Sequence, residues 1–313
     1  MAEDTLIVGC GYVGRRVAAA ERARGSYVGA LARSEESAQA LRALGIEPVG
    51  GDLDDPDSLA GLDVAGQGVY YFAPPPASGV RDTRMTAFLA AIAPRPPLRV
   101  VYISTTGVYG DCHGEWVDET RAPNPTADRA RRRLDAEEQL RAFGTRSACE
   151  VVILRVPGIY GPDRLPVERL RKGLPLLREA EAPWSNRVHA DDLVAACLAA
   201  MDRGRPGGVY NVSDGHPSTM TDYFRRVADA LGLPRPPEVS RAESADRPSM
   251  ACGPRLGPIG EATERIDAGM LSYLGESKRI DNRRMREELG VTPRYPTLAE
   301  GLPACLPSAR HGS

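Results

Sequence analysis

The chain has 313 residues but only two lysines, Lys172 and Lys278, although lysine and arginine together number 40. Arginine carries almost all of the positive charge, so an arginine at a candidate site can reflect composition as well as function. No apolar run approaches the roughly 20 residues of a membrane-spanning helix, and the N-terminus leads into a strand pattern, not a signal peptide. The formal net charge of -2 gives no basic surface for nucleic acid or membranes. We expect a cytoplasmic monomer or homodimer whose partners are small molecules.

The cysteines are scattered and show none of the paired spacings of a zinc ribbon or a disulfide framework. We therefore expect free thiols and no metal site. The cysteines are Cys10, Cys112, Cys149, Cys197, Cys252 and Cys305.

Short apolar runs alternate with helix-spaced segments through the first half of the chain. The runs are rich in β-branched or aromatic residues, as strands are, and intervening segments such as 13–24 and 35–44 repeat apolar residues at helical spacing. Strands that are apolar along their whole length are typical of a parallel sheet covered on both faces. The sequence predicts an α/β fold with a doubly wound parallel sheet, the Rossmann arrangement. The expected strands are residues 6–8, 27–32, 46–49, 68–72, 100–104 and 151–156.

The pattern loosens in the second half, which is richer in proline and glycine connections. We expect a Rossmann domain at residues 1–160 and a smaller C-terminal lobe at 161–306, with Rossmann elements returning near 188–212 and a frayed tail at 307–313. Residues 240–269 are rich in proline, glycine and charged residues, which predicts a loop that orders only around a ligand. Further expected elements are a strand at 208–212 and helices at 190–202, 220–231 and 283–288.

The first strand is followed by a Gly-x-Gly-x-x-Gly turn that opens a helix, which is the context a dinucleotide-binding turn requires. Gly9 permits the tight turn, Gly11 lets the backbone approach a pyrophosphate, and Gly14 allows close packing of helix on strand. Phosphates would lie at the positive end of the helix. The residues between the glycines, Cys10, Tyr12 and Val13, line the same predicted cofactor site.

The end of the second strand bears on the choice of cofactor. NAD sites usually carry an acidic residue there, whereas this chain has Arg33 and Ser34, which suit a 2′-phosphate. Asp52 and Leu53 follow the third strand, where Asp52 could accept from the adenine amino group. Arg33 could instead be a solvated surface arginine, and Asp52 a helix N-cap. The pattern favours NADP(H) over NAD(H).

A motif after the fifth strand, STTGVYG at 104–110, resembles that of the extended short-chain dehydrogenases/reductases, the NAD-dependent epimerase/dehydratase family. RVPGIYGP at 155–162, RVHADDL at 187–193 and YNV at 210–212 continue the resemblance in order. Two further strings, GESKRIDN at 275–282 and YP at 295–296, look like an atypical subgroup of uncharacterised bacterial epimerase-like proteins.

The resemblance implies a Ser or Thr that polarises a substrate oxygen, a Tyr that acts as general acid and base, and a Lys one helical turn later. Thr105 matches the first. The other two positions hold Arg129 and Arg133, and no Tyr-x-x-x-Lys pair occurs anywhere in the chain. Arg133 could still bind the cofactor ribose, but a guanidinium stays protonated and is a poor proton shuttle. Both arginines could instead lie on a solvated helix face, paired with Glu137 and Glu138.

Another residue must then transfer any proton. Tyr109 is the first candidate, because it follows the carboxyl end of the fifth strand, where open α/β sheets place ligands. The alternative is that Tyr109 is a packed aromatic residue of the motif. His113 and Asp128 are weaker candidates, and His189 more often bonds a helix start than acts as a base.

The resemblance also implies the remaining site residues. Ala73, Pro74 and Pro75 follow the fourth strand beside the nicotinamide ribose. Ser104 and Pro157 lie at the cofactor, whereas Thr106, Arg129, Asn186 and Arg187 face the substrate, with walls from 184–187 and 240–269. We expect an NADP(H)-binding oxidoreductase or epimerase acting on a small oxygenated substrate. The alternative is a non-redox dinucleotide sensor or interaction protein derived from such an enzyme.

Overall fold

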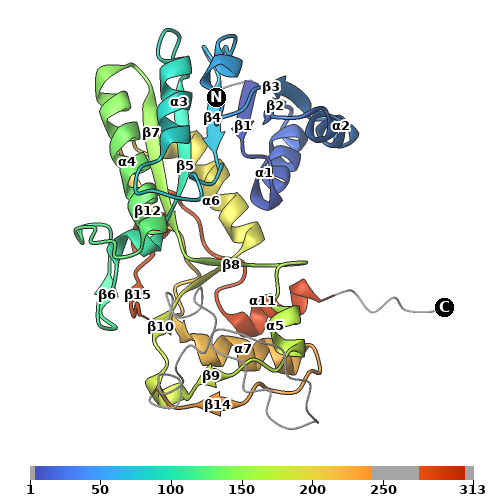
Figure 1. Ribbon diagram of the computed structural model, residues 1–313, viewed down its shortest axis with the longest axis vertical. Helices are drawn as coiled ribbons and strands as arrows, with labels where there is room; N and C mark the ends of the chain where they lie inside the picture. Colours follow the sequence, from blue (N-terminus) through green and yellow to red (C-terminus); the bar gives the residue numbers. More distant parts are fainter. Residues whose placement is uncertain (1–3, 242–274, 307–313) are drawn as a thin grey trace, which may run out of the picture.

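The computed structural model describes residues 4–241 and 275–306. Its central feature is a sheet of seven parallel strands in the order β12-β7-β5-β4-β1-β2-β3 (Figure 1). The predicted doubly wound parallel sheet is confirmed, and the predicted strands agree with the observed ones to within two residues at each end. The strands are β1 (Asp4–Val8), β2 (Tyr27–Ala32), β3 (Glu47–Gly50), β4 (Gly68–Tyr71), β5 (Arg99–Thr105), β7 (Glu150–Val156) and β12 (Val209–Asn211).

Helices cover both faces of this sheet. Three of them share one apolar core with the sheet, and two pack on the opposite face with η1 (Pro56–Leu59) at its edge. The first group is α1 (Tyr12–Ala23), α2 (Glu35–Ala43) and α6 (Ala190–Arg203), and the second is α3 (Thr83–Ile92) and α4 (Asp128–Arg146).

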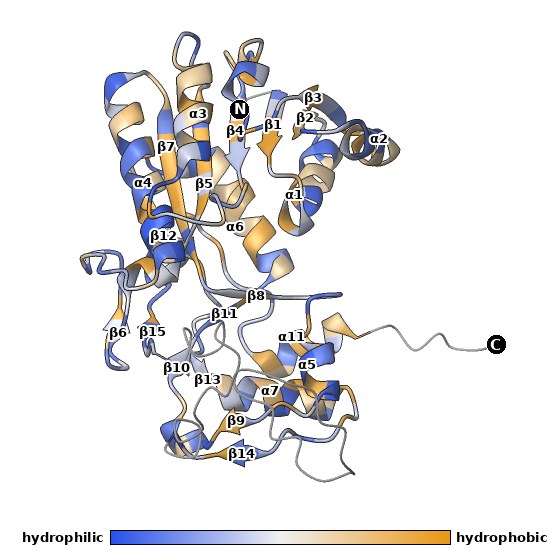
Figure 2. Cartoon of the chain, viewed as in Figure 1, coloured by the Kyte–Doolittle hydropathy of each residue, from blue (hydrophilic) through white to orange (hydrophobic). Residues whose placement is uncertain are grey.

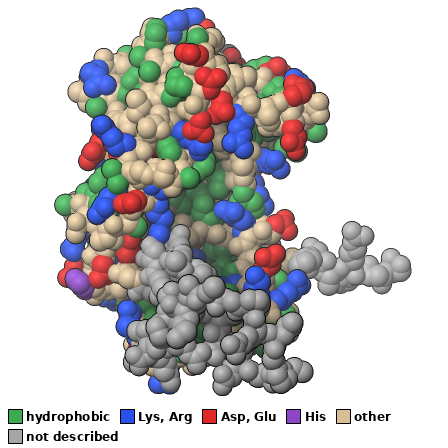
Figure 3. Space-filling model, in the orientation of Figure 1, with side chains coloured by type: hydrophobic (Ala, Val, Ile, Leu, Met, Phe, Trp, Pro, Cys, Tyr) green, Lys and Arg blue, Asp and Glu red, His purple; other side chains and the backbone are tan. Residues whose placement is uncertain are grey.

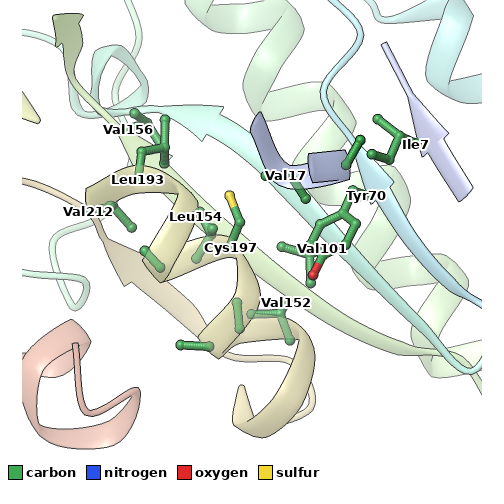
Figure 4. Close-up of a cluster of buried hydrophobic side chains, with 14 of the residues drawn as sticks. Ile7, Val17, Tyr70, Val101, Val152, Leu154, Val156, Leu193, Cys197 and Val212 are labelled. Carbon is green, nitrogen blue, oxygen red and sulfur yellow. The ribbon is translucent and has the colours of Figure 1, made fainter. Parts of the chain in front are cut away.

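The strands are apolar on both sides because both sides are buried. Ile7, Tyr70 and Val101 point into the core that α1 and α6 cover (Figure 4). The neighbouring residues Val69 and Val100 point into the other core. Burial on both faces explains the hydrophobic colour along much of β5 and β7 in Figure 2.

The C-terminal lobe lies below the carboxyl ends of the strands and has a core of its own (Figure 1). Tyr223 and Phe224 of α7 pack there with Leu298 and Leu302 of α11. Its elements are β8 (Gly158–Tyr160), α5 (Val167–Arg171), β9 (Leu176–Leu177), η3 (Glu179–Glu181), β10 (Trp184–Ser185), β11 (Arg187–His189), β13 (Ser218–Thr219), α7 (Met220–Ala230), β14 (Glu238–Val239) and α11 (Leu298–Cys305).

Two segments tie the late part of the chain back to the sheet domain. Strand β15 (Arg279–Ile280) pairs in parallel with β6 (Trp116–Val117), which follows η2 (Thr106–Tyr109). Helix α10 (Arg283–Glu288) then packs beside β12.

The five cysteines among the described residues are free, and Cys252 lies outside them. The predicted loop at 240–269 lies outside the described residues from 242 onward, as does the predicted tail at 307–313. None of the helices in the described ranges combines the length and the apolar character needed to cross a membrane.

Candidate active site

The turn between β1 and α1 is built so that only glycine fits its first position. Gly9 has φ of +94°, and a Cβ there would lie 2.4 Å from the Ala73 nitrogen after β4. A Cβ on Gly14 would come within 2.8 Å of the Gly9 carbonyl oxygen. Gly11 faces open space, with no atom within 4 Å of an added Cβ. The turn therefore packs tightly against the sheet and leaves room for a ligand on its outer side.

The N-terminus of α1 suits a phosphate. No side chain of the described residues caps this end, and no acidic residue occupies its first turn. A dinucleotide pyrophosphate therefore fits the backbone N–H groups and the positive end of the helix. The Tyr12 hydroxyl donates to the Pro162 carbonyl oxygen at 2.7 Å, Val13 packs at the margin of the core, and burial raises the pKa of the Cys10 thiol to about 11. In this turn Gly11 thus faces open space, whereas the side chains of Tyr12 and Val13 contact other parts of the protein.

The residues after β2 divide into two roles. Arg33 is exposed at the carboxyl end of the strand. The Ser34 hydroxyl is instead the N-cap of α2, where it accepts from the Ser37 nitrogen at 3.2 Å within a reciprocal capping box. The expected cofactor contact of the Ser34 side chain thus competes with helix capping, whereas the Arg33 guanidinium remains on the surface that faces solvent.

The loops after β3 and β4 are joined by a residue that the sequence analysis missed. Arg84 donates to Asp54 at 2.7 Å and to the Pro74 carbonyl oxygen at 3.0 Å. Asp52 is half-buried and accepts from the Asp54 nitrogen at 3.0 Å, an intraloop bond and not a helix cap. Leu53 packs at the edge of the core. Arg84 therefore fixes the two loops between which an adenosine moiety would lie.

Arg133 holds the carboxyl ends of two strands together. Its guanidinium donates to the Ala73 carbonyl oxygen at 3.3 Å, the Ile103 carbonyl oxygen at 3.2 Å and the Tyr102 hydroxyl at 3.3 Å. The suggested pairing of Arg133 with Glu137 on a solvated helix face is wrong, because Glu137 is fully buried and bonds elsewhere. Arg133 therefore lies at the ends of β4 and β5, where the resemblance places a lysine.

Glu137 is the centre of a buried polar network that the sequence analysis did not foresee. Its carboxylate accepts from Arg155 Nη2 at 2.7 Å and Nε at 3.1 Å, and from the Ser104 hydroxyl at 2.6 Å. Ser104 is therefore turned into the network and away from the cofactor face. An arginine inside the otherwise apolar run 151–156 was the sequence signal that a buried acid must face it.

Tyr109 is buried away from the candidate site, which corrects its expected role in proton transfer. Its side chain is 1% exposed, and its hydroxyl donates to Asn211 Oδ1 at 2.8 Å. The Arg155 guanidinium lies 4.8 Å from its ring centroid, while burial raises the pKa of Tyr109 to about 12. Tyr109 is thus a packed aromatic residue of the motif, which is the alternative interpretation given in the sequence analysis.

The weaker proton-transfer candidates also lie outside the site. His113 and Asp128 are exposed on the surface. His189 is buried, and its Nδ1 accepts from the Asp191 nitrogen at 3.2 Å at the start of α6. Burial lowers the pKa of His189, which fits a neutral capping residue.

A cavity of about 540 Å³, hereafter the central cavity, lies where the sheet meets the lobe. Figure 3 shows the surface hollowed between the two parts, with hydrophobic side chains inside. Several predicted residues line it together, namely Pro75, Thr105, Thr106, Arg129, Arg133, Pro157, Asn186 and Arg187. The lobe adds further walls, including Ile159, Pro183, Trp184, Met220, Tyr223 and Phe224.

Thr105, the last residue of β5, lines this cavity. Its hydroxyl oxygen accepts from the Gly107 nitrogen at 3.1 Å. A hydroxyl that accepts in this way still has its own hydrogen to donate. Thr105 can therefore offer a hydrogen bond to an oxygen atom of a ligand in the cavity.

Asn186 and Arg187 line the cavity but also hold the lobe together. Asn186 bonds the backbone of the returning segment, donating to the Lys278 carbonyl oxygen at 3.0 Å and accepting from the Ile280 nitrogen at 2.8 Å. Arg187 donates to the Asn186 carbonyl oxygen at 2.7 Å, and its guanidinium lies 4.3 Å from the Tyr223 ring centroid. Both side chains therefore have structural partners within the protein. The substrate contacts that the resemblance implies for them stay predictions.

The returning segment brings two charged residues into the cavity that the sequence analysis did not select. Glu276 and Lys278 both line it and form an ion pair with a 2.6 Å contact. They belong to the string GESKRIDN, which the sequence analysis had taken only as a mark of resemblance. Their distance along the chain from every other cavity residue kept them from being grouped with the site.

A model described as the NAD dependent epimerase/dehydratase family matches residues 5–213, more than half of the chain. The chain belongs to this family. The resemblance seen in the sequence is therefore confirmed, and the fold and the dinucleotide turn described above are those of a family of nicotinamide-dependent enzymes.

Two curated relatives of this family member align over nearly its whole length. Protein YeeZ of Escherichia coli (strain K12) is 29% identical over 94% of this chain and 97% of its own. A 4-hydroxy-2-methyl-3-oxo-4-farnesyl-3,4-dihydroquinoline-1-oxide ketoreductase of Stigmatella aurantiaca is 28% identical over 95% of this chain and 93% of its own. Among solved structures, a functionally unknown conserved protein from Silicibacter pomeroyi DSS is 32% identical, with a TM-score of 0.78 over 96% of this chain and 97% of its own.

Proposed function

We propose that this member of the family binds NADP(H) and acts as an oxidoreductase or epimerase on a small oxygenated substrate, without a Tyr-x-x-x-Lys pair. The observation that carries the proposal is the central cavity. It runs from Pro75, in the loop after β4, past Thr105 and into the apolar walls of the lobe. A cofactor on the glycine turn and a substrate in the lobe would therefore meet at Thr105.

Each part of this cavity has a proposed role. The bound nicotinamide would supply or accept hydride. Thr105 donates a hydrogen bond to the reacting oxygen, and Arg133 keeps a positive charge beside the cofactor ribose. The substrate contacts come from Thr106, Arg129, Asn186 and Arg187. The ketoreductase among the curated relatives supports carbonyl reduction as one form of the activity.

The preference for NADP(H) rests on the exposed arginine after β2. Arg33 stands where an acidic residue would bind a ribose 2′-hydroxyl, and a guanidinium binds a phosphate well. Arg33→Asp should therefore weaken NADPH binding by about tenfold or more and leave NADH binding weakened much less, since one lost charge-assisted bond is about 1.5–3 kcal/mol. Arg171→Asp, which changes an exposed arginine of α5, is the matched control.

The activity itself is tested by following NADPH absorbance while carbonyl and sugar-nucleotide compounds are screened. Oxidation by the parent chain, and its loss in a Gly11→Trp, Arg33→Asp variant, is the expected result. Full turnover by that variant would contradict the proposal. A redox-neutral epimerisation would leave the final absorbance unchanged, so product analysis accompanies each negative assay.

A second candidate function, a non-redox dinucleotide sensor, draws support from the two arginines of α4. Arg129 cannot shuttle protons, and Arg133 bonds three oxygen atoms of the protein itself. NADPH that binds but is neither oxidised nor used in product formation with any compound of the screen would favour the sensor. Oxidation with any of them would exclude it.

A further inference from the structure

Glu276 and Lys278 are two of the charged residues that line the central cavity. Their side chains are 11% and 7% exposed, so both charges are held largely out of water. The pairing of β15 with β6 and the two bonds to Asn186 fix the backbone from Lys278 onward. Before it, the Ser277 nitrogen donates to Asp111 Oδ1 at 2.8 Å. The position of this pair is therefore determined by the fold and not by a mobile surface chain.

Lys278 is anchored to the same turn that presents Thr105. Its Nζ donates to the Gly110 carbonyl oxygen at 2.6 Å and to Glu276 Oε2 at 2.6 Å. Gly110 directly follows η2, whose N-cap is Thr105. The ammonium group and the Thr105 hydroxyl therefore serve one cavity from the two ends of a single short turn.

One N–H group of Lys278 and one carboxylate oxygen of Glu276 have no hydrogen-bond partner among the described residues. An ammonium group has three N–H donors, and two are used, so one has no partner among the described residues. Glu276 Oε1 is buried and likewise lacks a partner in the described part of the chain. A buried polar atom left without a partner costs about 1–3 kcal/mol, so these two neighbouring groups are suited to a ligand that accepts one hydrogen bond and donates another.

We propose that Lys278 gives the proton to the substrate carbonyl oxygen in place of the missing tyrosine, and that Glu276 Oε1 accepts from a hydroxyl on the adjacent carbon. The substrate class is then an α-hydroxy carbonyl compound, whose carbonyl and hydroxyl oxygens lie side by side as the donor and acceptor do. This inference rests on the proposed reductase function.

With NADPH bound, the carbonyl carbon would gain hydride from the cofactor, which would leave as NADP⁺, and the electron pair of the broken π bond would move to the carbonyl oxygen. Lys278 transfers one proton from Nζ to that oxygen, giving a diol. The transfer is downhill because an alkoxide is far more basic than an amine. The neutral amine regains a proton from water as the product leaves, and the Glu276 carboxylate stabilises the restored ammonium.

The rest of the substrate faces an apolar and aromatic wall. Trp184, Met220, Tyr223 and Phe224 line the same cavity. An aryl group is therefore a suitable partner for the α-hydroxy carbonyl end. The probe is 2-hydroxyacetophenone, and acetophenone, which lacks only the hydroxyl, is its matched control.

The test measures NADPH oxidation with both ketones for the parent chain and three variants. The parent should prefer 2-hydroxyacetophenone by about tenfold, the effect of one hydrogen bond to a charged acceptor. Lys278→Arg keeps the charge and the donors but cannot release a proton, so kcat should fall by about 10²-fold or more while KM changes little. Glu276→Gln should lose most of the preference for the hydroxyl. Lys172→Arg, at the other lysine, is the control and should behave as the parent.

Two further measurements do not depend on turnover. NADPH fluorescence should report parent-like cofactor binding in all three variants, which establishes that they fold. Calorimetry with NADP⁺-loaded chain should show that 1-phenyl-1,2-ethanediol, the product, binds about tenfold more weakly to Glu276→Gln than to the parent.

The outcomes separate this inference from the function on which it rests. Retention of parent kcat by Lys278→Arg, or NADPH oxidation with simple ketones but not with the hydroxy ketone, would overturn the inference and leave a reductase. Equal product affinity in Glu276→Gln and the parent would also overturn it. NADPH binding without oxidation by any compound of the screen would overturn the reductase function and this inference together.

Discussion

Glu137 and Arg155 form an ion pair inside the protein, with Oε2 2.7 Å from Nη2 and side chains that are 0% and 2% exposed. The pair joins α4 to β7, and the Ser104 hydroxyl adds β5 to the same carboxylate. Two desolvated charges are stable together only when each satisfies the other. The helix that carries Arg129 and Arg133 is therefore set against the sheet by this pair.

Loss of one partner of this pair should be strongly destabilising. Glu137→Gln leaves the Arg155 guanidinium uncompensated, and the free energy of unfolding should fall by about 3–5 kcal/mol, measured by urea denaturation. A Glu137→Met, Arg155→Met double variant should lose clearly less, because no buried charge remains. Glu35→Gln breaks an exposed pair with Arg42, which solvent screens, and should leave the free energy of unfolding almost unchanged. Equal losses in the buried and exposed variants would contradict this account.

Gly9→Ala should abolish tight cofactor binding. The added Cβ would lie 2.4 Å from the Ala73 nitrogen in a backbone conformation with φ of +94°, so the turn must move. We expect NADPH affinity to fall by at least about tenfold and stability by about 1–3 kcal/mol, measured by fluorescence titration and denaturation. Gly25→Ala is the matched control, since Gly25 has φ of +87° with no atom within 4 Å of an added Cβ. The Gly25→Ala variant should lose stability and keep its affinity for NADPH. Unchanged NADPH affinity in Gly9→Ala would contradict the prediction, because it would show that the turn tolerates the clash.

Asp214 should make stability depend on pH. Burial raises its pKa to about 7, against a smaller lowering by the His216 N–H bond and Arg187. Since the pKa is raised in the folded state, the folded protein prefers the neutral acid. The stabilisation is complete below the ordinary pKa of about 4 and is lost as the pH rises to about 7, by up to roughly 4 kcal/mol. Denaturation at pH 5 and pH 8 measures most of the loss, and Asp214→Asn should flatten the dependence on pH. A pH dependence that is the same in Asp214→Asn would assign the effect to another group.

Arg133→Met should loosen the cofactor side of the sheet. It removes the donor shared by the Ala73 and Ile103 carbonyl oxygens, so unfolding free energy should fall by about 1–3 kcal/mol and NADPH binding should weaken. Arg133→Lys should keep much of the binding because it keeps a cation. Arg131→Met, on the exposed face of the same helix, is the control. NADPH affinity that falls equally in the Arg131 and Arg133 variants would indicate a general effect of charge.

The sheet and the glycine turn could be predicted because both depend on residues that are close together in the sequence. Apolar runs bounded by helical spacing mark the strands, and the Gly9 turn depends on residues within a few positions of one another. The partner of Glu137 could not be predicted in the same way. Whether a helical glutamate meets solvent or Arg155 depends on which face of α4 docks, and docking is decided by the whole core.

The cavity was predicted only in part for the same reason. Thr105, Arg129 and Arg133 come from neighbouring elements and line one cavity, while their roles stay predictions. Tyr109 was placed there wrongly, since the 3₁₀ turn after β5 rotates its side chain into the core beside Asn211. Glu276 and Lys278 reach the cavity only through the pairing of β15 with β6, which no local pattern reveals.

The pairing of β15 with β6 has a consequence for how the protein is made. Synthesis runs from the N-terminus, so all seven strands of the sheet, ending with β12 at Val209–Asn211, leave the ribosome before Lys278 does. The glycine turn can be complete on the nascent chain while the cavity still lacks Glu276 and Lys278. Ability to hold a dinucleotide should therefore precede ability to bind substrate, and a chain arrested before β15 should be competent for the first and not the second.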